Sequence, residues 1–126
     1  MRASGILMPI SSLPSAHGIG AMGAEARRFV EFLSKAGQAY WQILPICPTS
    51  YGDSPYQSFS TFAGNPYFID LDELAKRDLL LPEEYENIDW ESAPDTINYG
   101  ALYEKRYKVL RCAANRLLAK PNAAYR

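Results

Sequence analysis

An α/β fold with two neighbouring parallel strands is predicted by three stretches near the start of the sequence. Residues 4–8 form a short apolar run closed by Pro9, and residues 24–37 carry apolar side chains at helical spacing. Residues 38–44 form a second run, rich in aromatic and apolar side chains and ended by Pro45. A strand, a helix and a strand in this order predict a right-handed crossover between parallel strands.

The first strand, at Ser4–Met8, shows neither alternation nor helical spacing, which predicts burial on both faces. Residues 10–23 follow it. Pro14 and three glycines, at positions 18, 20 and 23, predict a loop without regular structure there.

The helix is expected to begin at Ala24 and to stop near Gly37. Its polar residues face away from a single apolar stripe. The predicted stripe consists of Ala26, Phe29, Val30, Leu33 and Gly37.

After the second strand, residues 45–66 form a long loop with four prolines. Loops longer than about 12–15 residues are uncommon in compact domains and are often functional. Residues 67–71 are predicted to form a short strand, residues 72–78 a short helix and residues 82–85 a turn. Residues 99–119 predict a longer helix, whose apolar stripe contains Tyr103, Leu110, Ala113 and Leu117.

Two strands and one crossover cannot cover both faces of a parallel sheet. We therefore expect further strands outside these 126 residues, and we expect the isolated chain to be marginally folded or to self-associate through its strand edges.

Composition excludes several classes of function. A formal charge of −1 argues against a nucleic-acid partner, and the apolar run Ile6–Ile10 is too short for a membrane span or a signal peptide. Cys47 and Cys112 lie far apart and His17 is alone, so neither a disulfide framework nor a metal site is expected. A reduced, cytoplasmic setting fits this pattern best.

Residues 18–23 read Gly-Ile-Gly-Ala-Met-Gly, the glycine spacing typical of dinucleotide-binding turns. In that fold the glycine turn follows its strand directly and an acidic residue ends the next strand. Here residues 9–17 intervene, and the second strand ends in Ile43, Leu44 and Pro45. The alternative is that the glycines only shape the loop before the helix.

The loop also carries the side chains that a sugar site needs. Sugar rings bind to flat aromatic surfaces flanked by short polar groups. Tyr51 and Tyr56 supply the aromatic surfaces, while Asp53, Ser54 and Gln57 supply the polar groups. A loop that follows a parallel strand is also where α/β folds build their sites. The alternative is a surface loop whose tyrosines pack for stability.

Retaining glycoside chemistry requires two carboxylates roughly 5 Å apart. Asp70, Asp72 and Glu73 are acidic, but they lie at the start of a predicted helix, where acids are common. No catalytic residue is therefore assigned among these 126 residues.

Five motifs together resemble the opening of the amylomaltases, the 4-α-glucanotransferases of glycoside hydrolase family 77 in the α-amylase clan. The similarity extends from about Arg2 to Leu81 and then thins into a variable insertion. The motifs are Ser12-Leu13-Pro14, Gly18-Ile19-Gly20, residues 41–45 (WQILP), residues 51–57 (YGDSPYQ) and residues 63–66 (AGNP).

This resemblance implies a TIM (β/α)8 barrel. Residues 1–66 would hold its first two βα units, with the sugar-binding loop 45–66, and residues 67–126 would begin an inserted, mainly helical subdomain. The family transfers α-1,4-glucan segments between maltooligosaccharides, or starch- and glycogen-type glucans, through a covalent intermediate and without a cofactor. Its catalytic carboxylates would lie beyond Arg126, which leaves a non-catalytic glucan-binding module as the alternative for this stretch alone.

By the same resemblance, Tyr56 corresponds to a tyrosine that stacks under the sugar at the cleavage point, and Asp53 and Ser54 line the site. Tyr51 resembles an aromatic residue that contacts glucan farther out. Where the family commonly has a histidine after the first strand, this chain has Met8 and Pro9, so no role is transferred to that position.

Overall fold

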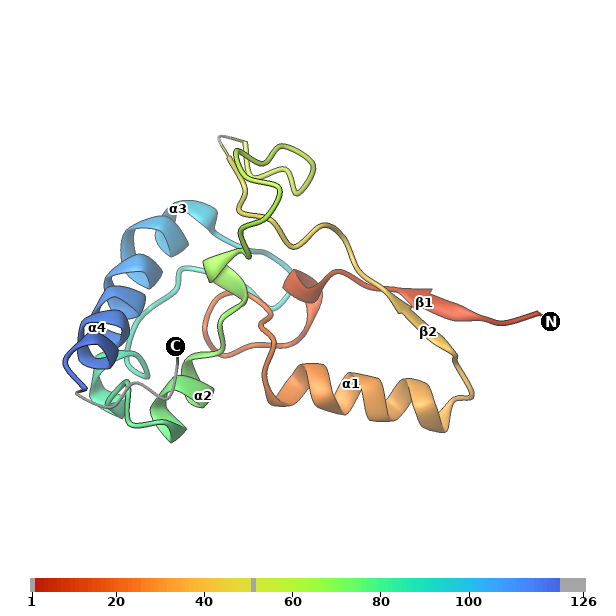
Figure 1. The fold of residues 1–126 in the computed structure, drawn as a ribbon, viewed down its shortest axis with the longest axis horizontal. Helices are drawn as coiled ribbons and strands as arrows, with labels where there is room; N and C mark the ends of the chain where they lie inside the picture. The colour runs from red at the N-terminus through yellow and green to blue at the C-terminus, as the bar shows by residue number, and fades with distance from the viewer. Residues whose placement is uncertain (1, 51, 121–126) are drawn as a thin grey trace.

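The structure is a computed structural model that describes residues 2–50 and 52–120, with helices and strands in one chain (Figure 1). The two strands lie at one end of the folded molecule, and most helices lie at the other end. In chain order the elements are β1 (Gly5–Leu7), η1 (Ile10–Ser12), α1 (Ala24–Lys35), β2 (Tyr40–Gln42), η2 (Pro66–Phe68), α2 (Leu71–Lys76), η3 (Pro82–Glu84), α3 (Tyr99–Ala101), the π-helical η4 (Leu102–Arg106) and α4 (Tyr107–Leu118).

The predicted pairing of two parallel strands is confirmed. β1 and β2 pair in parallel, with Ile6 opposite Trp41, and further backbone hydrogen bonds extend the ladder past both ends. The expectation that the first strand is buried on both faces is wrong for the described chain, because every residue of β1 is exposed. α1 packs along the sheet, where Phe29 meets Trp41 edge-on, and no third strand covers β1 in the described part of the chain.

The helix predicted from residue 24 is present as α1. Leu33 is the buried residue of its apolar stripe, whereas Val30 on the same stripe is exposed. Gly37 follows the helix with a φ of 70°, the left-handed conformation that glycine adopts readily at a helix end.

The segment before α1 is more ordered than predicted, because one turn of 3-10 helix, η1, forms within it. Gly20 packs directly on this turn, and a Cβ atom there would lie 2.1 Å from the Ile10 carbonyl oxygen. Gly18 has a φ of 82° and lies against Trp90. The glycines therefore serve internal packing, which supports the loop-shaping alternative over dinucleotide binding.

The strand predicted at residues 67–71 is wrong, because η2 covers residues 66–68 and α2 begins at Leu71. Asn65 caps this turn by accepting a hydrogen bond from the Tyr67 backbone N–H at 3.0 Å, and Pro66 fixes the helical φ at its first position. The short helix and the turn predicted next are confirmed as α2 and η3, and the side chain of Asp70 caps α2.

The long helix predicted at residues 99–119 is confirmed as α3, η4 and α4. Of its predicted stripe, Ala113 is buried and Leu110 and Leu117 pack against the core, whereas Tyr103 does not. Tyr103 is 70% exposed, whereas the neighbouring Leu102 is fully buried. The buried residues Leu102, Arg106, Val109 and Ala113 recur every three or four positions, which is the ordinary spacing of one helix face.

Most of the hydrophobic core lies between these later elements. The helices bury it against the loop before α1, which contributes Ile19. The remaining core residues are Tyr67, Leu71, Leu79, Leu80, Tyr85, Trp90, Leu102, Val109 and Ala113.

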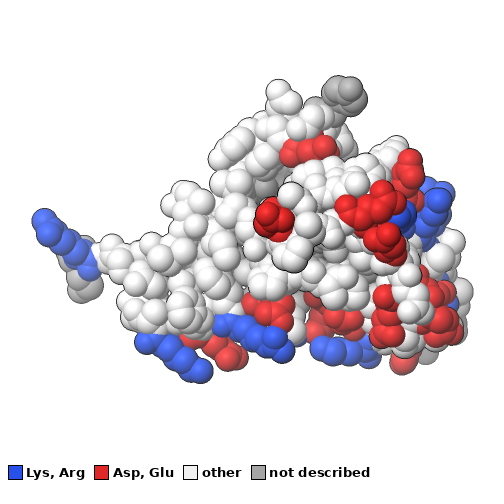
Figure 2. Space-filling view, turned by 180° about the vertical axis from the view of Figure 1, so that it is seen from behind, with Lys and Arg blue, Asp and Glu red and all other residues white. Residues whose placement is uncertain are grey.

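Charged side chains gather along the helices on the face seen in Figure 2, while much of the surface toward the sheet carries no charge. Several charged side chains of the described residues form ion pairs, such as Arg27 with Glu73 and Arg116 with Glu84. Within the described ranges, no helix combines the length and the apolar character that crossing a membrane requires.

Candidate functional site

A cleft of about 130 Å³ lies where the two strands end. Parallel strands place their carboxyl ends at the same edge of a sheet, which is where α/β folds bind their ligands. Its walls come from the residues after β1, the residues after β2, the loop 45–66 and the start of α3. They are Pro9, Ile10, Ser11, Leu44, Pro45, Thr49, Asp53, Pro55, Asn65, Phe68 and Tyr99.

Hydrogen bonds fix the strand ends that lead into this cleft. The Trp41 indole N–H donates to the Met8 carbonyl at 2.8 Å, and the Met8 N–H donates to the Gln42 carbonyl at 2.9 Å. The chain therefore leaves both strands at defined positions before it turns into the cleft walls.

The loop is closed at its base and folded on itself. The Asn65 N–H donates to the Ile46 carbonyl at 2.7 Å, which brings the two ends of the loop together. Within it, the Asp53 N–H donates to the Ser50 carbonyl at 3.1 Å in a tight turn. Gly52 and Asp53 both have positive φ there, and aspartate is among the few residues that tolerate this conformation.

Of the predicted sugar-binding residues, Asp53 lines the cleft. The Ser54 hydroxyl accepts a hydrogen bond from the Tyr56 N–H at 3.3 Å, so it stabilises the loop. The Tyr56 ring is 72% exposed and Gln57 is exposed, and neither contributes to the cleft walls. Tyr51 lies outside the described residues.

The charge of Asp53 contributes to raised pKa values of two tyrosines. Burial raises the pKa of Tyr99, and the negative charge of Asp53 adds to that effect. Burial, followed by Tyr107 and Asp53, raises the pKa of Tyr67 to about 12. Both phenols therefore remain protonated at neutral pH. The cleft combines a carboxylate acceptor in Asp53 with a phenol in Tyr99, a pair that suits a hydroxyl-rich ligand.

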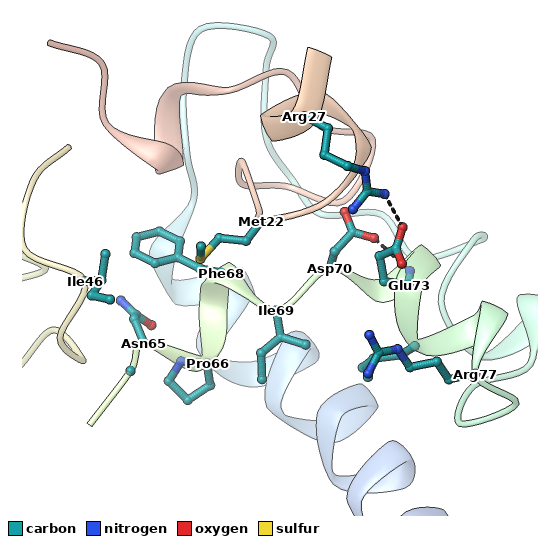
Figure 3. A pocket seen from close by; sticks show the side chains of 12 residues that line it. Met22, Arg27, Ile46, Asn65, Pro66, Phe68, Ile69, Asp70, Glu73 and Arg77 are labelled. Carbon is teal, nitrogen blue, oxygen red and sulfur yellow. Dashed lines mark hydrogen bonds and ion pairs between the residues drawn. The ribbon is translucent and has the colours of Figure 1, made fainter. Parts of the chain in front are cut away.

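A larger hollow of about 500 Å³ lies on the other side of the segment 65–70 (Figure 3). Arg27 and Glu73 form an ion pair at its rim, and its floor includes Phe68 and Ile69. None of the residues predicted to bind sugar lines it. We therefore place the candidate site in the cleft at the strand ends.

The three acidic residues at the start of α2 have structural partners. Asp70 accepts from the Glu73 N–H at 2.9 Å, and Asp72 accepts from the Tyr85 hydroxyl at 2.9 Å. Hydrogen bonds from Lys76 and Arg27 lower the pKa of Glu73. Among residues 2–50 and 52–120, no group of three or more His, Cys, Asp or Glu side chains could hold a metal ion.

Sequence reasoning missed several residues of the cleft. Ile10 and Leu44 could have been found, because they lie just after the predicted strands. Nothing in the sequence indicates that Tyr99 lines the cleft, because it lies more than 30 positions after the other lining residues. Two further aromatic residues in the loop, Phe59 and Phe62, are exposed and do not line the cleft.

Comparison with known proteins places this geometry in a family. The family model described as 4-alpha-glucanotransferase matches residues 8–126. The similarity therefore continues past Leu81, where the sequence analysis expected it to thin.

Individual relatives agree with the family model. A 4-alpha-glucanotransferase of Clostridium butyricum is 52% identical over 118 residues, which cover 94% of this chain and 24% of that protein. The enzyme of Thermus thermophilus is 49% identical over 111 residues, covering 87% of this chain and 21% of that protein.

A solved structure, the amylomaltase from Streptococcus agalactiae in complex with acarbose, superposes with a TM-score of 0.94 at 47% identity. That match covers 98% of this chain and 25% of the amylomaltase. The chain spans about a quarter of the length of these relatives, and over that span it belongs to the 4-alpha-glucanotransferase family.

Proposed function

We propose that the chain is the N-terminal part of a 4-α-glucanotransferase that moves α-1,4-glucan segments between maltooligosaccharides. The observation that carries this proposal is the continuous similarity from residue 8 to residue 126, at about half identical positions, to proteins of that activity. The reaction would retain configuration through a covalent intermediate, which requires a nucleophilic carboxylate and an acid/base carboxylate. Both would lie outside these 126 residues.

Within the complete protein, residues 1–66 would supply the first two βα units of a (β/α)8 barrel, and residues 67–126 would begin an inserted helical subdomain. The parallel pairing of β1 and β2 around α1 supports the first assignment. The exposed strand residues Ile6 and Leu7 support it too, because barrel strands are covered on both faces.

The substrate would be a maltooligosaccharide or a starch- or glycogen-type glucan, bound without a cofactor. Asp53 would accept hydrogen bonds from sugar hydroxyls, and the exposed ring of Tyr56 would stack under the sugar at the cleavage point. Ser54, Gln57 and Tyr51 would supply further contacts to the glucan. We place the protein in the cytoplasm, where its two free cysteines would stay reduced.

Incubation with maltotriose tests the proposed reaction. The complete protein should release glucose and form longer oligomers, whereas the 126-residue chain should do neither, because the missing carboxylates supply most of the rate enhancement. A product ladder made by the 126-residue chain would place catalysis within it, and an inactive complete protein would contradict the proposed function.

Kinetics of Tyr56→Ala and Tyr51→Ala in the complete protein test the site. Tyr56 would contact the sugar that distorts toward the transition state, so its loss should lower kcat as well as kcat/KM, by about tenfold. Tyr51→Ala should chiefly raise KM, because an outer contact binds substrate and transition state alike. Tyr103→Ala serves as the control, since Tyr103 is similarly exposed but lies on η4, outside the cleft. An unchanged kcat in Tyr56→Ala would contradict the assignment.

The isolated chain would self-associate through β1 and β2. Size-exclusion chromatography with light scattering measures this directly. A monomer with a cooperative unfolding transition would contradict this proposal, because the strands would then be stable without further partners.

A further inference from the structure

Arg106 is the one charged residue that is fully buried among residues 2–50 and 52–120, with 1% of its surface exposed. It lies at the end of η4, the π-helical turn between α3 and α4. Its guanidinium packs over Trp90, 5.8 Å from the ring centroid. A buried cation is costly, so its partners need an explanation.

Two backbone carbonyl groups hold this guanidinium. Nη1 donates to the His17 carbonyl at 2.9 Å, and Nη2 donates to the Ile69 carbonyl at 2.7 Å. No carboxylate of the described residues lies within ion-pair distance of it. Burial lowers the pKa of Arg106 to about 10, and the more distant Asp70 partly opposes that effect.

A buried cation that bonds to neutral carbonyls and packs on an aromatic ring, without a carboxylate partner, contributes little to stability, because its desolvation offsets these contacts. The two hydrogen bonds instead fix the relative position of two backbone segments. They join the loop between β1 and α1, which contains His17, to the segment 65–70, which contains Ile69. These segments are more than 40 positions apart in the sequence.

Both joined segments form walls of the cleft at the strand ends. Ser11 comes from the first and Phe68 from the second. Backbone hydrogen bonds connect the loop before α1 to both of these wall residues. The Gly20 N–H donates to the Ser11 carbonyl at 3.1 Å, and the Met22 N–H donates to the Phe68 carbonyl at 2.9 Å.

We propose that Arg106 is a positioning residue for the sugar-binding cleft, which sets the spacing between the loop before α1 and the segment 65–70. It touches no substrate and acts through the two backbone walls. Its effect on turnover rests on the proposed transferase function. Its effect on the backbone does not.

Arg116 provides a matched control. It lies on α4, and its Nη1 also donates to a backbone carbonyl, that of Leu79, at 2.7 Å. Its other partner is Glu84. Neither partner lines the cleft, so substitution of Arg116 removes comparable contacts at a distance from the site.

The experiment compares Arg106→Lys with Arg116→Lys in the complete protein. A lysine keeps the positive charge but cannot bridge two carbonyls with a rigid fork. Arg106→Lys should lower kcat for maltotriose roughly 10- to 100-fold, as expected when reacting groups are misplaced by about 1 Å. Arg116→Lys should retain kcat at a temperature where both variants are folded.

Amide hydrogen exchange supplies a readout that does not depend on activity. The Gly20 and Met22 amides should exchange faster in Arg106→Lys and at the wild-type rate in Arg116→Lys. Equal kcat losses in the two variants, or unchanged exchange at Gly20 and Met22 in Arg106→Lys, would overturn the proposal. If the wild-type protein has no transferase activity, the proposed function fails and the exchange rates alone decide the role of Arg106.

A measurement on the wild-type protein covers the case in which Arg106→Lys does not fold. The amides of Gly20 and Met22 should open together with those around Arg106 in η4, as one cooperative unit. Independent, faster opening of Gly20 and Met22 would show that Arg106 does not hold these segments.

Discussion

The strand region and the helical region of this chain bury their apolar side chains very differently. In the strand region, β1, α1 and β2 leave large apolar residues such as Ile6, Leu7 and Tyr40 exposed. In the helical region, from η2 to α4, residues such as Leu71 and Leu102 are almost completely buried.

The difference follows from how each element satisfies its hydrogen bonds and covers its faces. A helix completes its backbone hydrogen bonds within itself and needs to bury one stripe. A parallel sheet needs neighbouring strands along its edges and cover on both faces. The helical region therefore builds most of its core from its own residues, while the strand region leaves its apolar side chains uncovered by the described residues.

The largest expected effect is in the helical core. Leu102→Ala in the 126-residue chain should lower the free energy of unfolding by about 2–5 kcal/mol, because Leu102 is fully buried and its loss leaves a cavity. Urea unfolding followed by circular dichroism measures it. The adjacent Tyr103→Ala is the control and should change stability by less than about 0.5 kcal/mol. Similar losses in both variants would contradict the buried face assigned to η4.

A second substitution tests the strand region. Ile6→Ala should cost less than about 1 kcal/mol in the 126-residue chain, because Ile6 is 40% exposed there. In the complete protein the same change should cost about 2 kcal/mol or more, since the proposed barrel would bury this side chain. Thermal unfolding of both proteins gives the comparison. An equal loss of stability in the two proteins would contradict the proposed burial of Ile6 in the complete protein.

A pH dependence is expected from the link between η3 and α4. Hydrogen bonds from Arg116 and from the Leu81 N–H lower the pKa of Glu84 from 4.5 to about 2. Because the folded pKa is depressed, the stabilisation is present above the ordinary pKa and is lost as pH falls through the range from 4.5 to about 2. Wild type should exceed Glu84→Gln in urea midpoint at neutral pH and converge with it near pH 2. A constant difference at all pH values would contradict this.

The smallest effect is expected on the outer surface of α1. Arg28 pairs with Glu25 one turn earlier; the Arg28 side chain is exposed and that of Glu25 is partly exposed. Exposed pairs contribute little, so Arg28→Ala should change stability by less than about 0.5 kcal/mol. A melting-temperature shift as large as that of Leu102→Ala would show that α1 has partners that the described residues do not include.

Sequence patterns predicted the elements well where local signals agree. Gly37 ended α1 as expected, and the apolar runs on either side of that helix became a parallel pair. The prediction failed at residues 67–71, where an apolar run suggested a strand. There Asn65 and Pro66 provided a helix cap and a helical φ, and these local hydrogen bonds outweighed β-propensity.

The candidate site was predicted in its position but only partly in its residues. Asp53 was found because it belongs to a loop that follows a strand and carries sugar-binding residue types. Tyr99 and Arg106 were missed, because nothing in their local sequence indicates which distant segment they will contact.

The sequence by itself determined the order of elements, the α/β class, the loop at the strand ends and the resemblance to the 4-α-glucanotransferases. These features depend on hydrophobic spacing, turn residues and motifs, which are local properties of the chain. Only the tertiary structure decided that Tyr99 lines the cleft, that Leu102 is buried while Tyr103 is exposed, and that Arg106 joins the loop before α1 to the segment 65–70. Such contacts arise when segments far apart pack together, and the free energy of that packing is not encoded in any one segment.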